Sequence, residues 1–263
     1  MVVASVNVNG IRAAHRRGMP EWLQQRDPDV LLLQEVRADA DTVAEQLGEG
    51  WHVVEAVCAQ KGRSGVAVAS RRPLRDAVLT LPGFETDGRW VEATVGDGPD
   101  AVRCASVYVH SGEAGTDRQV DKMRFLAAMS VRLGELRAAE AAGGPPVVVA
   151  GDLNIGHTER DIRNWKGNRG KAGFLPEERA FLDAWYASGW VDVSRRLHGD
   201  VEGPFSWWSW RGKAFDTDAG WRIDVHVATE KLAATARFSD VDRAVAYDRR
   251  FSDHAPVVVG YDV

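Results

Sequence analysis

Residues 145–156 constrain the fold of this chain most, because a short apolar run there ends in two polar side chains. Residues 147–150 are too few for a helix and are rich in β-branched side chains, so we expect a buried strand. Asp152 and Asn154 follow it. If the chain stays extended there, their carboxylate and amide point to the same side and converge. The simpler interpretation is an ordinary turn, because both side chains bond their own backbone well.

Polar side chains also follow other strand-like runs. Residues 2–8 alternate as a strand, which places Asn7 on the same face as Val3 and Ser5. Residues 30–33 are all apolar, which is typical of a strand covered on both faces, and Glu35 comes just after them. We expect further strands at residues 51–57, 65–69, 90–95, 102–109, 221–227 and 257–259.

Helices are expected between these strands. One begins near Pro20, a long one spans residues 116–142, and one that begins near Pro176 ends at Gly189. The long helix has an apolar stripe that we interpret as core packing: Leu126, Met129, Leu133 and Leu136.

The composition is that of an ordinary globular protein, with 263 residues, 44% of them apolar and 27% charged. No linker-like segment interrupts it, so we expect one domain over residues 1–263. No apolar run is long enough for a membrane span and no signal peptide is evident, which favours the cytoplasm. Cys58 and Cys104 are expected to be small buried hydrophobes. A net charge of −5 argues against coating nucleic acid by bulk electrostatics, but not against a metal-using nuclease.

Each of two segments allows two structural interpretations, and the sequence does not decide between them. Residues 161–171 combine positive charges, amides and glycines, and form either a solvated loop or a loop that contacts phosphates. Residues 205–211 and Trp221 are unusually aromatic, and their rings either fill the core or stack on sugars or bases.

Oxygen-bearing side chains recur at separate strand ends. If two stacked sheets bring these ends together, carboxylates and amides would bind a hard cation such as Mg²⁺ beside a histidine. The sequence has no Cys/His cluster that would indicate a zinc site and no glycine-rich motif that would indicate dinucleotide binding. It also lacks the Gly-x-Ser-x-Gly motif of enzymes that form an acyl intermediate on serine. Metal-assisted hydrolysis of a phosphate ester is the chemistry that remains. The side chains concerned are Asn7, Glu35, Asp152, Asn154, Asp224, Asp253 and His254.

Six motifs resemble, in order, those of the exonuclease III family of abasic-site endonucleases. They are NVNG at residues 7–10, LQE at 33–35, Tyr108, GDLN at 151–154, GWRID at 220–224 and SDHAP at 252–256. The resemblance implies a four-layer α/β sandwich, with two packed mixed sheets and helices outside. It implies cleavage of duplex DNA 5′ to abasic sites with Mg²⁺ or Mn²⁺, leaving a 3′-hydroxyl, and trimming of blocked or ordinary 3′ ends. We expect a monomer.

The resemblance also assigns roles to individual residues. Glu35 would be the principal metal ligand, supported by Asn7 and Asp253. Asp224 would orient His254, which would hold a phosphate oxygen or help to generate the attacking water.

Three further roles concern the phosphate and the DNA. Asp152, positioned by Asn154, would activate the water or assist the leaving oxygen, and Tyr108 would bind the phosphate. Whether Asp152, His254 or a metal-activated water is the base stays open. Substrate binding is assigned to Trp207, Trp221 and Ile223 in an apolar pocket for a flipped abasic sugar, and to Arg89, Asn164 and Asn168 on the DNA backbone.

Four positions depart from the family pattern. Arg37 stands where many members have lysine, His110 where proline is frequent, and Ser111 where glutamine or asparagine is common. His226 is unusual in its strand, and we favour a structural role for it over a catalytic one. Rival functions are another phosphoesterase on the same sandwich, acting on inositol phosphates, sphingomyelin or RNA, and a lesion-binding protein without catalysis.

Overall fold

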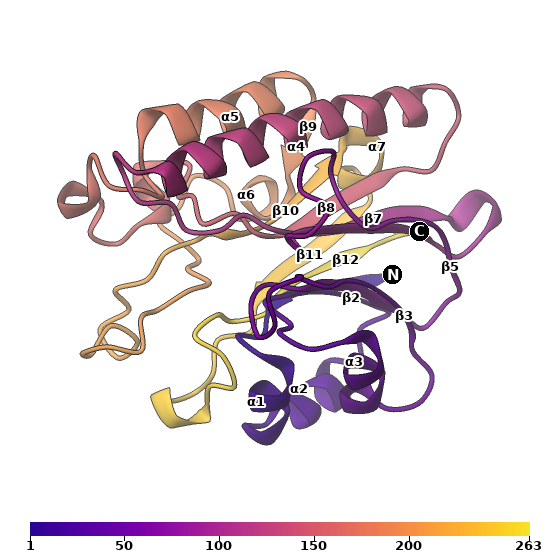
Figure 1. Cartoon of the computed structure of the whole chain (residues 1–263), viewed down its shortest axis with the longest axis horizontal. Helices are drawn as coiled ribbons and strands as arrows, with labels where there is room; N and C mark the ends of the chain where they lie inside the picture. The colour runs from indigo at the N-terminus through magenta and orange to yellow at the C-terminus, as the bar shows by residue number, and fades with distance from the viewer.

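Two six-stranded sheets lie face to face in the computed structural model, which describes residues 1–263 (Figure 1). The first sheet contains, in spatial order, β11 (Ala236–Val241), β12 (Val257–Tyr261), β1 (Val2–Asn7), β2 (Val30–Gln34), β4 (Val66–Ser70) and β3 (His52–Ala56). The second contains β5 (Leu74–Val78), β6 (Trp90–Val95), β7 (Val102–Tyr108), β8 (Val147–Asp152), β10 (Asp224–Thr229) and β9 (Trp190–Asp192). Both sheets are mixed, since β1 and β2 are parallel, as are β7 and β8, among antiparallel neighbours.

Helices cover the outer face of each sheet and complete four layers (Figure 1). The first sheet carries α1 (Ile11–Arg16), α2 (Met19–Arg26) and α3 (Ala40–Leu47), and the second carries α4 (Asp117–Ala141) and α5 (Pro176–Ala187). The short helices α6 (Val193–His198) and α7 (Glu230–Ala233) pack against β10. The expected four-layer sandwich of two packed mixed sheets is confirmed. No helix is long and apolar enough to cross a membrane.

The central strands are buried on both faces. In β2, Val30 and Leu32 point into the core between the sheets, whereas Leu31 and Leu33 point into the core under α1 to α3. Each such side chain contributes roughly 1.5–3 kcal/mol by leaving water. The interpretation of residues 30–33 as a doubly covered strand is therefore confirmed.

The long helix α4 packs its expected stripe, Leu126 to Leu136, against the second sheet and α5. It begins and ends within one residue of the expected bounds. Lys122 lies on the same stripe and is also fully buried. A charged side chain on an apolar stripe needs a partner there.

The strand expected at residues 221–227 is shifted along the chain. It is β10, which begins at Asp224, while Trp221 makes only isolated bridges with Trp207 and Ile162. Asp224 and His226 lie on the face of β10 that packs on the first sheet, and both are buried. Asp224 lies opposite Asp152 in the antiparallel register.

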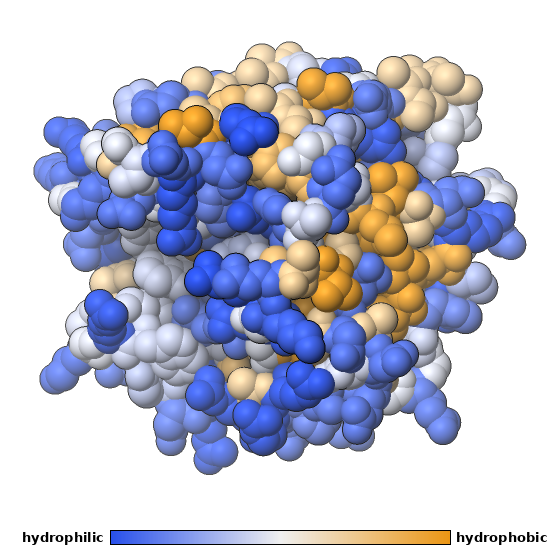
Figure 2. All heavy atoms as spheres, in the orientation of Figure 1, coloured by the Kyte–Doolittle hydropathy of each residue, from blue (hydrophilic) through white to orange (hydrophobic).

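Three strands at sheet edges were not expected from the sequence: β5, β9 and β11. Figure 2 shows a patch of hydrophobic residues where β3 and β5 lie at the margin of the sandwich, and Val57 and Leu79, just past these strands, are about half exposed. The cysteine prediction is confirmed for Cys104, which is buried, and wrong for Cys58, which is only partly buried.

Candidate active site

The expected polar side chains converge at one edge of the sandwich because the strands that carry them end there. Asn7 ends β1, Tyr108 ends β7 and Asp152 ends β8, while Asp224 begins the antiparallel β10. Glu35 follows β2 with a left-handed φ of 48°, which turns its side chain out of the strand. Parallel pairing of β1 with β2 and of β7 with β8 brings these ends to the same side.

Asp152 and Asn154 form both the turn and the convergence that their spacing suggested. Asn154 has a left-handed φ of 49°, so the chain is not extended there. Its backbone N–H donates to Asp152 Oδ1 at 2.8 Å, and its Nδ2 donates to Asp152 Oδ2 at 3.0 Å. The turn itself therefore holds both oxygens of the carboxylate in place.

Asn7 joins the two sheets at this edge. Its Nδ2 donates to Glu35 Oε1 at 2.9 Å and to Asp152 Oδ2 at 3.0 Å, and its oxygen accepts the N–H of Asn9. The amide nitrogen therefore holds the two carboxylates together. Arg37 pairs with the other oxygen of Glu35, so its guanidinium keeps a charge beside that carboxylate.

His254 is oriented by Asp224 and faces Asp152. Its Nδ1 lies 2.9 Å from Asp224 Oδ2, and its Nε2 lies 3.7 Å from Asp152 Oδ2. Ser206 Oγ donates to the same Asp224 oxygen at 2.6 Å. This arrangement leaves Nε2 of the ring directed at Asp152.

Burial and the neighbouring charges raise the pKa values of both members of this pair. Burial raises the pKa of Asp152 to about 8; His254 opposes the rise, and the carboxylates of Asp224 and Glu35 add to it. Burial alone would lower the pKa of His254, but Asp224 and Asp152 outweigh it and raise this pKa to about 10. The His254 ring is thus an imidazolium at neutral pH.

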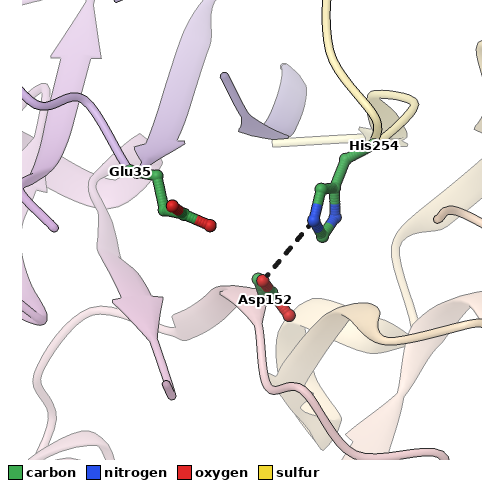
Figure 3. A group of neighbouring side chains, drawn as sticks. All are labelled: Glu35, Asp152 and His254. Atoms are coloured by element: carbon green, nitrogen blue, oxygen red, sulfur yellow. Dashed lines mark ion pairs between the residues drawn. The ribbon is translucent and has the colours of Figure 1, made fainter. Parts of the chain in front are cut away.

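Glu35, Asp152 and His254 form the group that could hold a metal ion, with one donor atom from each lying within 4.8 Å of the others (Figure 3). The two carboxylates supply the hard oxygens that Mg²⁺ prefers, so the donor set fits such a cation. Asp253 lies outside this group, because its oxygens accept from Asn9 Nδ2 at 2.7 Å and Trp207 Nε1 at 3.1 Å. Its expected support of the metal, like that of Asn7, stays a prediction.

A small pocket opens beside Asn154. It has a volume of about 200 Å³, and Trp207, Trp221 and Ile223 form its apolar part. The two indole rings meet edge to face at 6.3 Å. Gly112 and Gly173 line the same pocket. We call it the apolar pocket below.

The aromatic segment divides between the two interpretations that the sequence left open. Trp208 is core, since it is buried with Phe205 and Phe215. Trp207 and Trp221 line the apolar pocket. Trp210 is neither, because it lies under the guanidinium of Arg250.

A larger hollow lies on the other side of Glu35. It has a volume of about 730 Å³ and is lined mostly by charged and polar side chains, among them Glu35, Tyr108 and Arg89. Arg89 pairs with Asp87 at 3.2 Å and with Asp121 at 3.0 Å. Burial, with help from Glu35 and Asp152, raises the pKa of Tyr108, so its hydroxyl keeps its proton. We call this the charged hollow.

The loop with Asn164 and Asn168 lies outside both hollows. The structure places Asn164 and Lys166 at the surface, and the Asn168 amide donates to Asn164 O at 3.0 Å. Arg163 N donates to Gly220 O at 3.1 Å, which fixes the loop next to Trp221. Contact with DNA through this loop stays a prediction.

The positions that depart from the family pattern lie at the rim of the candidate active site or in the core. His110 Nε2 bonds Arg118 O at 3.1 Å, and burial lowers the His110 pKa to about 4. Ser111 accepts from Arg118. His226 is buried with Nε2 bonded to Val257 O at 3.0 Å, and burial lowers its pKa to about 4. A neutral ring away from the site fits the structural role that we favour.

Sequence reasoning missed several residues that support the site. Ser206 bonds Asp224, and Asn9 bonds Asp253. Lys122 Nζ donates to the backbone oxygen of Asn154 at 3.0 Å. Its place on the apolar stripe of α4 was the signal that could have found it.

Comparison with known proteins identifies the family. The model of the endonuclease/exonuclease/phosphatase family matches residues 4–254. An exodeoxyribonuclease of Bacillus subtilis is 34% identical over 260 residues, and exodeoxyribonuclease III of Haemophilus influenzae is 31% identical over 276; each alignment covers 98% of both proteins. The structure of an AP endonuclease from Archaeoglobus fulgidus has a TM-score of 0.87 at 26% identity and 100% coverage of both chains. The chain therefore belongs to the endonuclease/exonuclease/phosphatase family, and within it to the exonuclease III family of abasic-site endonucleases.

Proposed function

We propose that this chain is a divalent-metal-dependent DNA repair phosphodiesterase that cleaves duplex DNA 5′ to abasic sites and leaves a 3′-hydroxyl. We propose that it also trims 3′ ends. The observation that carries the proposal is the buried Asp152, held between Asn7, Asn154 and His254, directly beside a pocket of tryptophan rings. The names of the relatives, an exodeoxyribonuclease and an AP endonuclease, support both activities.

Asp152 is the proposed general base. Its oxygens are fixed by amide donors, and its raised pKa makes its carboxylate a stronger base than a solvated one. It would take a proton from the water whose oxygen attacks phosphorus. The bond from phosphorus to the 3′ oxygen then breaks, and that oxygen takes a proton to become the 3′-hydroxyl.

His254 and Tyr108 are the proposed phosphate-binding groups. The imidazolium, sustained by Asp224, donates from Nε2, and the phenol donates from a hydroxyl that stays protonated. Glu35 would hold the cation with a carboxylate oxygen. When bound, the cation would neutralise charge on the phosphate and make phosphorus easier to attack.

The apolar pocket would select the abasic nucleotide. Trp207, Trp221 and Ile223 offer apolar surface to a sugar that carries no base. An intact nucleotide costs more to extrude from the duplex and meets a wall of rings. Arg89 in the charged hollow, with Asn164 and Asn168 on their loop, would contact the DNA backbone.

The finer features of the proposal rest on the sequence resemblance and on composition. We propose Mg²⁺ as the cation, with Mn²⁺ as a substitute, because the carboxylate donors suit hard divalent ions. We also propose that residues 1–263 act as one catalytic domain, as a monomer, in the cytoplasm.

The test is a duplex with a single abasic analogue, incubated with Mg²⁺ or with EDTA. We expect scission on the 5′ side that needs the metal and is lost in Asp152→Asn. Asp183→Asn is the matched control, since Asp183 is exposed on α5 and pairs only with His157. Tight binding without scission would favour a lesion-binding protein, and turnover of a small phosphodiester without DNA cleavage would favour another phosphoesterase.

A further inference from the structure

A buried polar cluster on α4 and α5 lies directly behind the apolar pocket. It consists of Gln119, Lys122 and Glu178, and we call it the wall cluster. Lys122 Nζ donates to Glu178 Oε1 at 2.7 Å, and Gln119 Nε2 donates to the same oxygen at 2.9 Å. The side chains of Lys122 and Glu178 are 0% exposed. Neither charge can therefore be screened by solvent.

The wall cluster bonds two segments that line the apolar pocket. Lys122 Nζ donates to the backbone oxygen of Asn154 at 3.0 Å. Glu178 Oε2 accepts the backbone N–H groups of Gly173 at 2.7 Å and of Leu175 at 3.0 Å. Asn154 and Gly173 are both pocket residues, so one ion pair fixes two sides of it.

A third side of the pocket packs on the same cluster. A Cβ added at Gly112 would lie 1.9 Å from Gln119 Oε1 and 3.1 Å from Lys122 Cδ. A Cβ added at Gly173 would lie 3.0 Å from the Trp221 ring and 3.1 Å from the Asn154 oxygen. The backbone at Gly112 and Gly173 is thus already as close to these neighbours as glycine allows.

Packing alone does not explain an ion pair at this place. Lys122 occupies a position of the α4 stripe that Leu126 and Met129 continue with apolar side chains. A well-packed apolar pair in place of a buried ion pair is often at least as stabilising. What an apolar pair cannot do is hold the Asn154 oxygen and the Gly173 N–H at once.

On the basis of the proposed function, we propose that Lys122 and Glu178 are positioning residues that set the width of the apolar pocket and the direction of the Asn154 amide. They thereby determine the preference for an abasic sugar over an intact nucleotide. The link to chemistry is the Asn154 side chain, whose Nδ2 bonds Asp152. Without the bonds from Lys122 and Glu178, the backbone at Asn154 and Gly173 could move. That movement would widen the apolar pocket and weaken the hydrogen bond from Asn154 to Asp152.

The test compares two double variants that each remove one buried ion pair from α4. Lys122→Met with Glu178→Gln removes both charges and the donor to Asn154, and avoids leaving one charge unpaired. The control is Arg132→Met with Glu92→Gln, because Arg132 of α4 pairs with the buried Glu92 of β6 and neither residue lines either hollow. Arg103, which also pairs with Glu92, keeps its hydrogen bonds to Asp76 O and Thr94 Oγ1. Each protein receives an abasic duplex and a duplex with an undamaged recessed 3′ end, with Mg²⁺.

We expect the ratio of abasic-site incision to removal of undamaged 3′ nucleotides, in kcat/KM, to fall about tenfold or more in the first variant and to stay unchanged in the control. The loosened support of Asp152 should lower kcat on both substrates, and the widened apolar pocket should add a further loss on the abasic duplex alone. Equal losses of both activities, or a ratio no different from that of the control, would overturn the proposal.

Hydrogen exchange supplies a second readout that needs no activity. We expect faster amide exchange at residues 153–156 and 172–175 in the first variant and not in the control. If the wild-type protein fails to incise the abasic duplex, the proposed function is wrong. Unchanged amide hydrogen exchange in these two segments would instead contradict the positioning role of Lys122 and Glu178, whatever the substrate.

Discussion

The charged hollow, which Tyr108 lines, and the apolar pocket, which Asn154 lines, offer opposite surfaces near the proposed base Asp152. The charged hollow, of about 730 Å³, is lined by arginines and carboxylates, and the apolar pocket, of about 200 Å³, by tryptophan rings and an isoleucine. Charges hold a phosphate backbone of any sequence, whereas a small apolar wall selects by shape. Under the proposed function, this difference would separate affinity for DNA from selectivity for the abasic nucleotide within one site.

The two hollows also differ in the acids buried near them. Glu178, near the apolar pocket, has both oxygens bonded, by Lys122, Gln119 and two backbone N–H groups. Glu55 lies beside Gly65, next to the loop that rims the charged hollow, and neither of its oxygens has a partner. Glu178 is thus fully hydrogen-bonded behind the apolar pocket, whereas an unsatisfied acid lies next to the loop that rims the charged hollow.

Asp224→Asn should have the largest effect, because Asp224 orients and charges His254, the proposed phosphate-binding group for both activities. We expect kcat to fall by about 10²–10⁴ on abasic and 3′-end substrates alike. In the wild type the raised pKa, about 10, keeps His254 charged through neutral pH. The variant should lose that charge at lower pH, so its residual rate should fall as pH rises where the wild-type rate does not. Single-turnover rates between about pH 6 and pH 9 check this, and a selective loss on one substrate would contradict it.

Trp221→Ala should lower the preference for abasic sites without lowering the removal of undamaged 3′ nucleotides. Loss of the ring removes one wall of the apolar pocket, so incision at the abasic site should fall about tenfold while removal of undamaged 3′ nucleotides changes little. Steady-state kinetics on the two substrates measure the ratio. Trp210→Ala is the control, since Trp210 packs on Arg250 outside the pocket. A parallel decline on both substrates would remove the distinction between the two hollows.

Arg89→Gln should weaken the affinity for DNA without changing the preference between substrates. We expect KM to rise about tenfold on every DNA substrate, and the salt dependence of binding to decrease by about one phosphate contact. Titration of a fluorescent duplex at several salt concentrations measures this. Arg124→Gln is the control, because Arg124 is exposed and its nearest carboxylate oxygen lies 3.9 Å away. An altered substrate ratio would place Arg89 among the selective residues instead.

Glu55→Gln should have the smallest effect, and on stability rather than activity. Burial, assisted by Asp39, raises the Glu55 pKa from 4.5 to about 7. A raised folded-state pKa means that stability is fully present below about pH 4.5 and is lost as pH rises through about 7. The variant should therefore be more stable than the wild type by about 1 kcal/mol near pH 8, with no gain near pH 4.5. Urea unfolding at both pH values measures the difference, and an equal change at both would show that Glu55 does not titrate.

The central strands were predictable because burial on both faces leaves a strong pattern. β2 is a continuous apolar run, and β1 alternates between two cores. The missed strands β5, β9 and β11 lie at sheet edges, where one side of the strand has no partner. The side chains of β5 and β11 mostly face water, and β9 has only three residues. In β5, Arg75 and Asp76 are exposed, so neither apolar run nor alternation is visible.

The candidate site was predictable as a set of residues but not as a set of contacts. Asp152, Glu35 and His254 stand out because each follows or precedes a strong strand signal. The resemblance implied that Glu35 binds the metal with support from Asn7 and Asp253, which stays a prediction, and the structure brings donor atoms of Glu35, Asp152 and His254 within 4.8 Å of one another. Asn154 shows why, since its left-handed turn, and not an extended chain, aims its amide at Asp152.

The sequence by itself determined which polar side chains stand at the strand ends and which strands are buried, because both follow from short local patterns. Only the tertiary structure decided which of these side chains touch. Asn7 and Asp152 are 145 residues apart and on different sheets, and their contact depends on how the sheets pack. The raised pKa values of Asp152 and His254, and the ion pair behind the apolar pocket, have the same origin, because burial and charge act between neighbours in space.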